Sequence, residues 1–287
     1  MSDVTARTAG PPTTAQLRAE VRQVVSLGSL VRTLRAEWTK LRTTSGPAWL
    51  LVGTVVVTAA ISAAVAAASR CPAGTSCQID MAKTSLTGVE AGQAVVAILA
   101  VLTVCNEYSS QLIRTTLAAM PRRSAVLGAK AVLVGVLVLL AGAVAVGACI
   151  LVGREILPGH GFTAARGFPA LSLTSGPVLR AACGSMLYLT LIALLSIGIA
   201  VLVRDSAVAI GAALALLYVF PIVTSFVQNP TWQHRLQRYT PMAGLNIQAT
   251  TGLHSLPITP WGGLGVLALW AAAALLAGGV VFRLRDA

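Results

Sequence analysis

Long apolar runs alternate with short polar stretches along the chain, and this pattern predicts its fold class. Six runs are apolar over about 20 residues each: about 47–69, 87–105, 129–152, 181–203, 206–228 and 261–282. A helix of roughly 20 apolar residues crosses the hydrocarbon core of a bilayer, which is about 30 Å thick. The runs lack the strict apolar–polar alternation of a membrane β-strand. The sequence therefore predicts an all-α, polytopic membrane protein with six transmembrane helices within residues 47–287.

The residues before the first run divide into two parts. Residues 1–26 are polar and rich in Thr, Ala, Arg and Pro, so we expect a disordered cytoplasmic tail without a cleavable signal peptide. Residues 27–46 predict an amphipathic helix that lies in the membrane interface, with Trp38 at headgroup depth. Its apolar face consists of Leu27, Leu30, Val31, Leu34, Trp38 and Leu41. The alternative is an ordinary helix that packs on a soluble core.

Charge fixes the expected orientation. The chain is 56% hydrophobic and carries a net charge of +12, an excess that could suggest a nucleic-acid partner. Six spans place both termini on one side, which holds 14 of the Lys and Arg residues, whereas the other side holds seven. Cytoplasmic loops of membrane proteins are enriched in Lys and Arg. We therefore expect both termini in the cytoplasm, contacts of the basic residues with lipid, and no nucleic-acid binding.

The cysteines and histidines offer few sites for chemistry. Cys71 and Cys77 lie together in the first external loop, where they form a disulfide or remain two free thiols. The three histidines, His160, His234 and His254, come from two separate loops and have no ligand spacing. We therefore expect no metal site.

The polar segment 106–130, between the second and third runs, is the expected docking surface for a soluble cytoplasmic partner. It carries four positive charges and one negative charge, Glu107. Two blocks of helical character, 109–120 and 124–130, are separated by Pro121, which removes a backbone donor and favours a turn. The sequence contains no phosphate-binding loop, no catalytic Ser/His/Asp set and no paired carboxylates within the spans. We expect neither enzymatic activity nor a cofactor in this chain.

Four stretches resemble, in the same order, those of actinobacterial ABC-2 type transporter permeases. They are RAEWTKLRT (35–43), SLTGVEAGQ (85–93), EYSSQLIRTTLAAMPRR (107–123) and YTPMAGLNIQ (239–248). The third is the most specific, although Gln111 stands where the family usually has Gly. The resemblance extends from about residue 30 to the end of the chain. It implies one permease subunit of an exporter in the bacterial plasma membrane.

In such an exporter, two permease subunits, identical or different, assemble with two copies of a separate ATPase that binds ATP and Mg²⁺. The resemblance makes 106–130 a coupling loop that docks on the ATPase. The candidate coupling residues are Glu107, Tyr108, Gln111, Arg114, Arg122 and Arg123. Arg122 and Arg123 have an alternative role, which is to hold lipid phosphates.

The resemblance also implies that the second and fifth spans line the transport route. The candidate route residues are Glu90, Gln93, Tyr218, Phe220 and Phe226. From the sequence alone, Glu90 and Gln93 either lie solvated at the interface or line a cavity. Few polar groups occur within the spans, which favours a hydrophobic or amphipathic substrate. The alternative functions are a non-transporting scaffold, sensor or immunity component that binds an ATPase, and a channel or carrier that acts alone.

Overall fold

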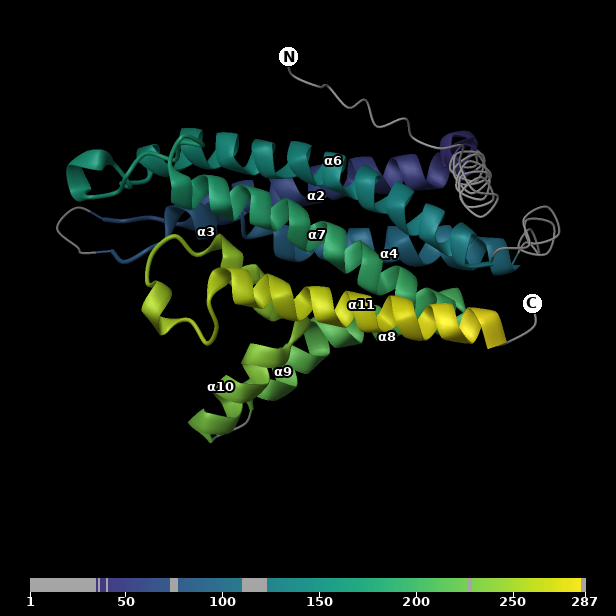
Figure 1. Cartoon of the computed structure of the whole chain (residues 1–287). Coiled ribbons are helices and arrows are strands. Elements are labelled where there is room, and N and C mark those ends of the chain that lie inside the picture. The colour runs from purple at the N-terminus through teal and green to yellow at the C-terminus, as the bar shows by residue number, and fades with distance from the viewer. Residues whose placement is uncertain are drawn as a thin grey trace, which may run out of the picture.

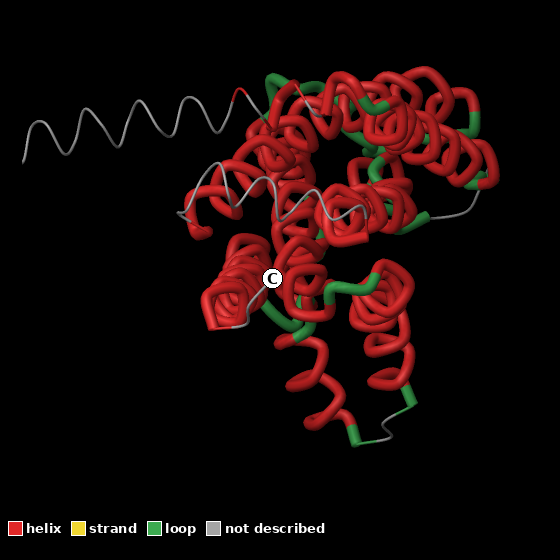
Figure 2. Tube along the Cα trace, turned by 90° about the vertical axis from the view of Figure 1, so that its right-hand side faces the viewer, coloured by secondary structure: helices red, strands yellow, loops and turns green. Residues whose placement is uncertain are grey.

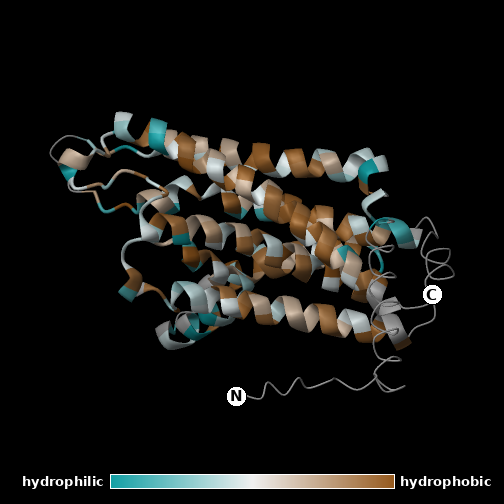
Figure 3. Cartoon of the chain, turned by 45° about the horizontal axis from the view of Figure 1, so that its top comes forward, coloured by the Kyte–Doolittle hydropathy of each residue, from teal (hydrophilic) through white to brown (hydrophobic). Residues whose placement is uncertain are grey.

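The computed structural model describes residues 35, 37–39, 41–72, 77–109, 123–226 and 229–284, and it confirms an all-helical protein with six candidate membrane spans (Figure 1). Five spans correspond to single helices: α2 (Ser45–Ala68), α4 (Gly88–Ser109), α6 (Arg123–Gly159), α7 (Gly176–Val203) and α11 (Pro260–Leu284). The remaining span, Ser206–Val223, runs through three consecutive helical segments. Hydrophobic residues predominate in the middle of the bundle, and hydrophilic residues are more frequent toward its ends (Figure 3).

The third span extends further than its apolar run. The sequence predicted a span over 129–152, whereas α6 contains 37 residues. At 1.5 Å per residue this helix is about 55 Å long, well beyond the bilayer core of about 30 Å. Hydropathy falls at Arg154 and Glu155, both exposed, but neither residue breaks a helix, so α6 continues to Gly159 outside the apolar layer.

The fourth span, α7, lies at the centre of the bundle. It packs against α4, α6, α8 and α11, and it contributes the fully buried Tyr188, Leu189 and Ile192 to the core (Figures 1 and 2). The first span, α2, packs on α4 and α6. Its contact with α4 is close because Gly88 and Gly92, four residues apart, face α2. A Cβ on Gly88 would lie 1.9 Å from the Thr58 carbonyl oxygen, which only glycine permits.

The fifth span is irregular, and Pro221 supplies a reason. The sequence predicted a kinked helix over 206–228. The structure instead has α8 (Ser206–Leu214), a π-helical segment η2 (Ala215–Val219) and α9 (Phe220–Ser225). Pro221 donates no backbone hydrogen bond and its ring crowds the preceding turn, which a wider turn relieves. After α9 the chain enters α10 (Pro230–Tyr239), and the two helices project from the bundle (Figures 1 and 2).

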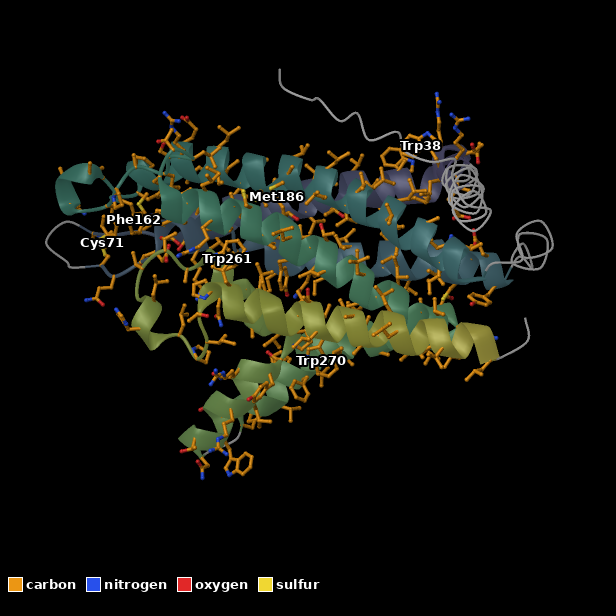
Figure 4. The ribbon with its side chains drawn as sticks, viewed as in Figure 1. Trp38, Cys71, Phe162, Met186, Trp261 and Trp270 are labelled. Atoms are coloured by element: carbon orange, nitrogen blue, oxygen red, sulfur yellow. A yellow bond between two sulfur atoms is a disulfide. The ribbon has the colours of Figure 1, made fainter. Side chains whose placement is uncertain are left out.

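The two ends of the bundle carry different polar groups. At one end, which we call the disulfide end, lie Cys71, Cys77, α3 (Met81–Ser85), η1 (Ala164–Arg166) and η4 (Leu253–Ser255). Figure 4 shows Cys71 and Phe162 at this end and Trp38 at the opposite end. That opposite end holds the last turn of α4, the start of α6 and the α7–α8 turn. It also holds three ion-paired residues, Glu37, Glu107 and Lys130, and we call it the triad end.

Exposed tryptophans lie near both ends of the apolar layer. Trp49, in the first turns of α2, is 73% exposed, and Trp261, at the start of α11, is 57% exposed. Tryptophan is enriched where a membrane meets water, because its ring is apolar and its N–H is polar. The six-span assignment is therefore supported by these tryptophans at the helix ends as well as by the hydropathy of the helices.

Candidate functional site

Lys130, in α6, is the centre of a buried ion-pair cluster at the triad end. In the sequence analysis, Lys130 is one of the four positive charges of segment 106–130, the expected docking surface for a cytoplasmic partner. The structure instead turns its side chain inward, and the residue is only 7% exposed. Its ammonium group lies 2.9 Å from Glu37 Oε2 and 3.0 Å from Glu107 Oε1. It also donates to the Thr103 carbonyl oxygen at 3.0 Å. We call Lys130, Glu37 and Glu107 the triad.

The triad joins three segments of the chain. Glu37 belongs to the segment expected to form the interfacial helix, and residues 37–39 and 41–43 are helical in the structure. Glu107 lies in the last turn of α4, and Lys130 lies in the second turn of α6. Glu37 is 2% exposed and Glu107 is 8% exposed. Buried charges are tolerated only when they are paired, so the triad fixes these three segments relative to one another.

Glu107 and Tyr108 were predicted to contact the ATPase, and the structure places both within the bundle's own packing. The Glu107 carboxylate faces Lys130 rather than the exterior. The Tyr108 ring lies beneath the Arg204 guanidinium, whose central carbon is 5.4 Å from the ring centroid, a cation–π arrangement. Both residues therefore help to hold the end of α4, where the segment between α4 and α6 begins.

Arg204 reaches Tyr108 from a strained turn. It follows α7 with a φ of 64°, in the left-handed region, and its N–H donates to the Ala200 carbonyl oxygen at 2.8 Å. Asp205 then begins α8 by accepting a hydrogen bond from the Val208 N–H at 2.8 Å. This two-residue turn brings the α7–α8 junction against the close of α4.

The four other predicted coupling residues belong to the segment between α4 and α6 or to the first residue of α6. Gln111, Arg114 and Arg122 lie outside the described residues. Arg123 begins α6, but its side chain also lies outside what the structure describes. Their roles in docking remain predictions.

A second polar cluster lies in the half of the bundle toward the disulfide end, where α4, α7 and η2 meet. The Tyr188 hydroxyl donates to Gln93 Oε1, and the Tyr218 hydroxyl donates to the Glu90 carbonyl oxygen. Gln93 and Tyr188 are fully buried, whereas the Glu90 side chain is exposed. The structure thus brings together three predicted route residues and adds Tyr188, which lies in an apolar run of α7.

Two other predicted route residues lie apart from this cluster. Phe220 is 39% exposed and Phe226 is 77% exposed, and both belong to the segment that leaves the bundle. The polar cluster consists mainly of neutral hydroxyl and amide groups, which can orient a ligand by hydrogen bonding but carry no charge to attract an ion. Sequence reasoning missed Tyr188 because nothing local distinguishes it from a packing residue.

At the disulfide end, Cys71 and Cys77 form a disulfide with an S–S distance of 2.07 Å. The Cys71 N–H donates to the His160 carbonyl oxygen at 3.0 Å, and Arg166 Nη1 donates to the Cys71 carbonyl oxygen at 2.8 Å. The bridged loop is thereby attached to the segment that follows α6. Within the described part of the chain, no three side chains of the metal-binding types come together.

The four stretches that carry the family resemblance meet in two pairs. Stretch 35–43 supplies Glu37 and stretch 107–123 supplies Glu107, and Lys130 joins the two. Stretch 239–248 ends at Gln248, whose side-chain amide donates to the Leu86 carbonyl oxygen of stretch 85–93 at 3.5 Å. The same amide donates to Ser185 Oγ at 3.2 Å in α7. Segments far apart in the sequence are therefore connected through buried polar groups.

Comparisons of the sequence with known protein families and with curated proteins found no match.

Proposed function

We propose that this chain is the membrane-spanning permease subunit of an ATP-binding-cassette exporter, located in the bacterial plasma membrane. The observation that carries the proposal is the triad, because it clamps both ends of the segment between the second and third spans. In the family that the sequence resembles, this segment docks on the ATPase. A docking loop can transmit force to the membrane helices only if its two ends keep their positions relative to each other. Glu107 and Lys130 lie one at each end of that segment. Their ion pair joins the two ends and so meets this requirement.

The triad suggests a path for mechanical coupling. Movement of an ATPase against residues 110–122 would be delivered to α4 and α6 together, since their adjoining ends are joined through Lys130. Glu37 extends this connection to the helix in the membrane interface. Such a unit moves as a rigid body and can bias the bundle between two packing arrangements. In this proposal a partner ATPase, in two copies, binds ATP and Mg²⁺, and a second permease subunit completes the complex.

The polar cluster of α4, α7 and η2 suggests the kind of substrate. Tyr188, Gln93 and Tyr218 provide neutral hydrogen-bonding groups within an otherwise apolar bundle. A π-helical segment at Tyr218 also fits a functional position, because π-bulges occur frequently at such sites. The long apolar helices around this cluster favour a hydrophobic or amphipathic substrate over a sugar or an ion.

The test begins with the neighbouring reading frames, one of which we expect to encode a phosphate-loop ATPase. That ATPase is then co-expressed with the chain, and the complex is purified. We expect the pure chain to hydrolyse no ATP and the complex to hydrolyse it. The double variant Arg114→Glu/Arg122→Glu, in the segment between α4 and α6, should weaken copurification of the ATPase at unchanged abundance of the chain. The control variant Arg235→Glu/Arg238→Glu, in α10, should leave copurification unchanged. Intact assembly and hydrolysis in the Arg114→Glu/Arg122→Glu variant would contradict the docking role.

Transport itself is tested in inverted membrane vesicles that contain the complex. ATP-dependent uptake of an amphipathic dye, absent with non-hydrolysable ATP, is the expected result. An ATPase that binds the chain without any ATP-dependent uptake, across apolar and amphipathic dyes, would instead favour the scaffold or sensor alternative.

A further inference from the structure

A cavity of about 820 Å³ lies at the disulfide end, away from both clusters described above. Three segments that are distant in sequence form its walls. They are residues 77–83, which include the start of α3, residues 167–178 before and into α7, and residues 249–256 after η3. Its volume is within the range of about 300–1,000 Å³ that is typical of small-molecule sites. All of these lining residues belong to one chain.

The walls of the cavity are held in place by specific bonds. The Asp80 carboxylate in the first wall accepts hydrogen bonds from Thr250 Oγ1 at 2.7 Å and from the Thr251 N–H at 2.8 Å in the third wall. Arg180 Nη2, in α7, donates to the Ala249 carbonyl oxygen at 2.6 Å. The disulfide ends at Cys77, on the first wall. The cavity is therefore preformed, which lowers the cost of binding a ligand.

The lining combines an apolar body with one available positive charge. Most of the surface is apolar, from Ile79, Met81, Phe168, Leu171, Val178 and Leu256. The two charged lining residues are Asp80 and Lys83. Asp80 already receives hydrogen bonds from Thr250, Thr251 and the Lys83 N–H. The Lys83 side chain is exposed, and no ion pair forms at it within the described residues. A ligand thus meets apolar walls and an ammonium group.

We infer that this cavity binds an amphiphile with an anionic headgroup, its hydrocarbon part against the apolar walls and its phosphate or carboxylate on Lys83. An ammonium group binds phosphate and carboxylate as a point charge. Each methylene of the chain that enters the cavity adds to the affinity by removing apolar surface from water. The ligand comes either from the surrounding bilayer, as an acidic lipid, or from solution, as a single-chain amphiphile. The inference concerns binding alone and does not depend on transport or on an ATPase.

The test uses the purified full-length chain in nanodiscs of phosphatidylcholine. Oleoyl lysophosphatidate is titrated as the anionic probe and oleoyl lysophosphatidylcholine as the zwitterionic probe with the same hydrocarbon chain. We expect saturable binding of the anionic probe, at least tenfold tighter than that of the zwitterionic one. Lys83→Glu should lower the affinity for the anionic probe at least tenfold. Arg154→Glu, which reverses an exposed charge on α6 outside the cavity, should change its affinity less than twofold.

A second variant tests the cavity itself. Ala170 is exposed and lines the cavity, so Ala170→Trp fills it without altering the buried core, and the anionic probe should lose at least tenfold in affinity. Native mass spectrometry from nanodiscs that also contain dioleoyl phosphatidate identifies the source. One retained phosphatidate, lost in Ala170→Trp, indicates the bilayer, whereas retention of the lysolipid alone indicates solution. Equal affinities for the two headgroups, or full binding to both variants, would overturn the inference.

Discussion

Replacing Lys130 with Met is the most direct perturbation of the triad. Met has a similar length but no charge, so the variant leaves the Glu37 and Glu107 carboxylates buried without the ammonium group that they share. At an effective dielectric constant of about 20, one ion pair at 3 Å is worth about 5 kcal/mol, before the cost of desolvation is subtracted. Measured losses from breaking one side of a buried pair are about 3–5 kcal/mol. We expect a loss of this size.

In the assay, the purified chain is heated in detergent, and the fraction that stays soluble is measured by size-exclusion chromatography. Tm is the temperature at which half of the chain is lost from this fraction. For a protein of this size, 1 kcal/mol corresponds to about 2–4 °C in Tm, so Lys130→Met should lower Tm by about 6–20 °C. The triple variant Lys130→Met/Glu37→Gln/Glu107→Gln removes all three charges together. It should recover most of the loss, because the two glutamine side chains no longer carry the charges that Lys130 neutralised. Arg154→Met, on the exposed part of α6, is the matched control.

Two results would refute this reasoning. A Tm for Lys130→Met within 2 °C of the native chain would mean that the ion pairs contribute little to the packing of α4 and α6. A triple variant as unstable as the single one would mean that the loss comes from the shape of the lysine side chain rather than from its charge. In either case the triad would not be the rigid base that the coupling proposal requires.

Two further predictions concern packing and pH. A Cβ on Gly198 would lie 2.5 Å from the backbone carbon of Ala274, so Gly198→Ala should separate α7 from α11 and destabilise the chain by about 1–3 kcal/mol. Gly147→Ala, where a Cβ meets nothing within 4 Å, should be neutral or up to about 1 kcal/mol stabilising in the same thermal assay; equal losses would contradict the close approach. Burial has the largest single effect on Asp80 and raises its pKa, but hydrogen bonds from Thr250, Thr251 and Lys83 together bring the pKa below its ordinary value. The stabilisation from Asp80 is therefore complete above the unfolded pKa of about 4, and it is lost as pH falls through the lower native pKa. Asp80→Asn should lower Tm at pH 7 and should make Tm fall less steeply on acidification. A Tm–pH curve identical to that of the native chain would contradict this.

The sequence by itself determined the fold class and the number of spans. The backbone N–H and C=O groups of an apolar run in a bilayer must form hydrogen bonds within the protein. For single runs of about 20 residues, a helix provides these bonds within each segment. The ends of the helices were less well determined. Hydropathy marks where a helix leaves the membrane, not where it ends, so α6 runs past Arg154 to Gly159. Pro221 predicted an irregularity in the fifth span, but not that a π-helical segment would accommodate it.

The role of Lys130 was decided only by the tertiary structure. A lysine in a basic loop, such as Lys130, has the same local sequence signal whether it faces solvent or two carboxylates. Its partners lie 93 and 23 residues away in sequence, in segments brought to it by packing. The same holds for Tyr188, whose hydroxyl is given a partner by Gln93 across the α4–α7 contact. Periodicity and hydropathy describe how a segment meets its surroundings, whereas pairing between distant segments depends on how the helices are arranged.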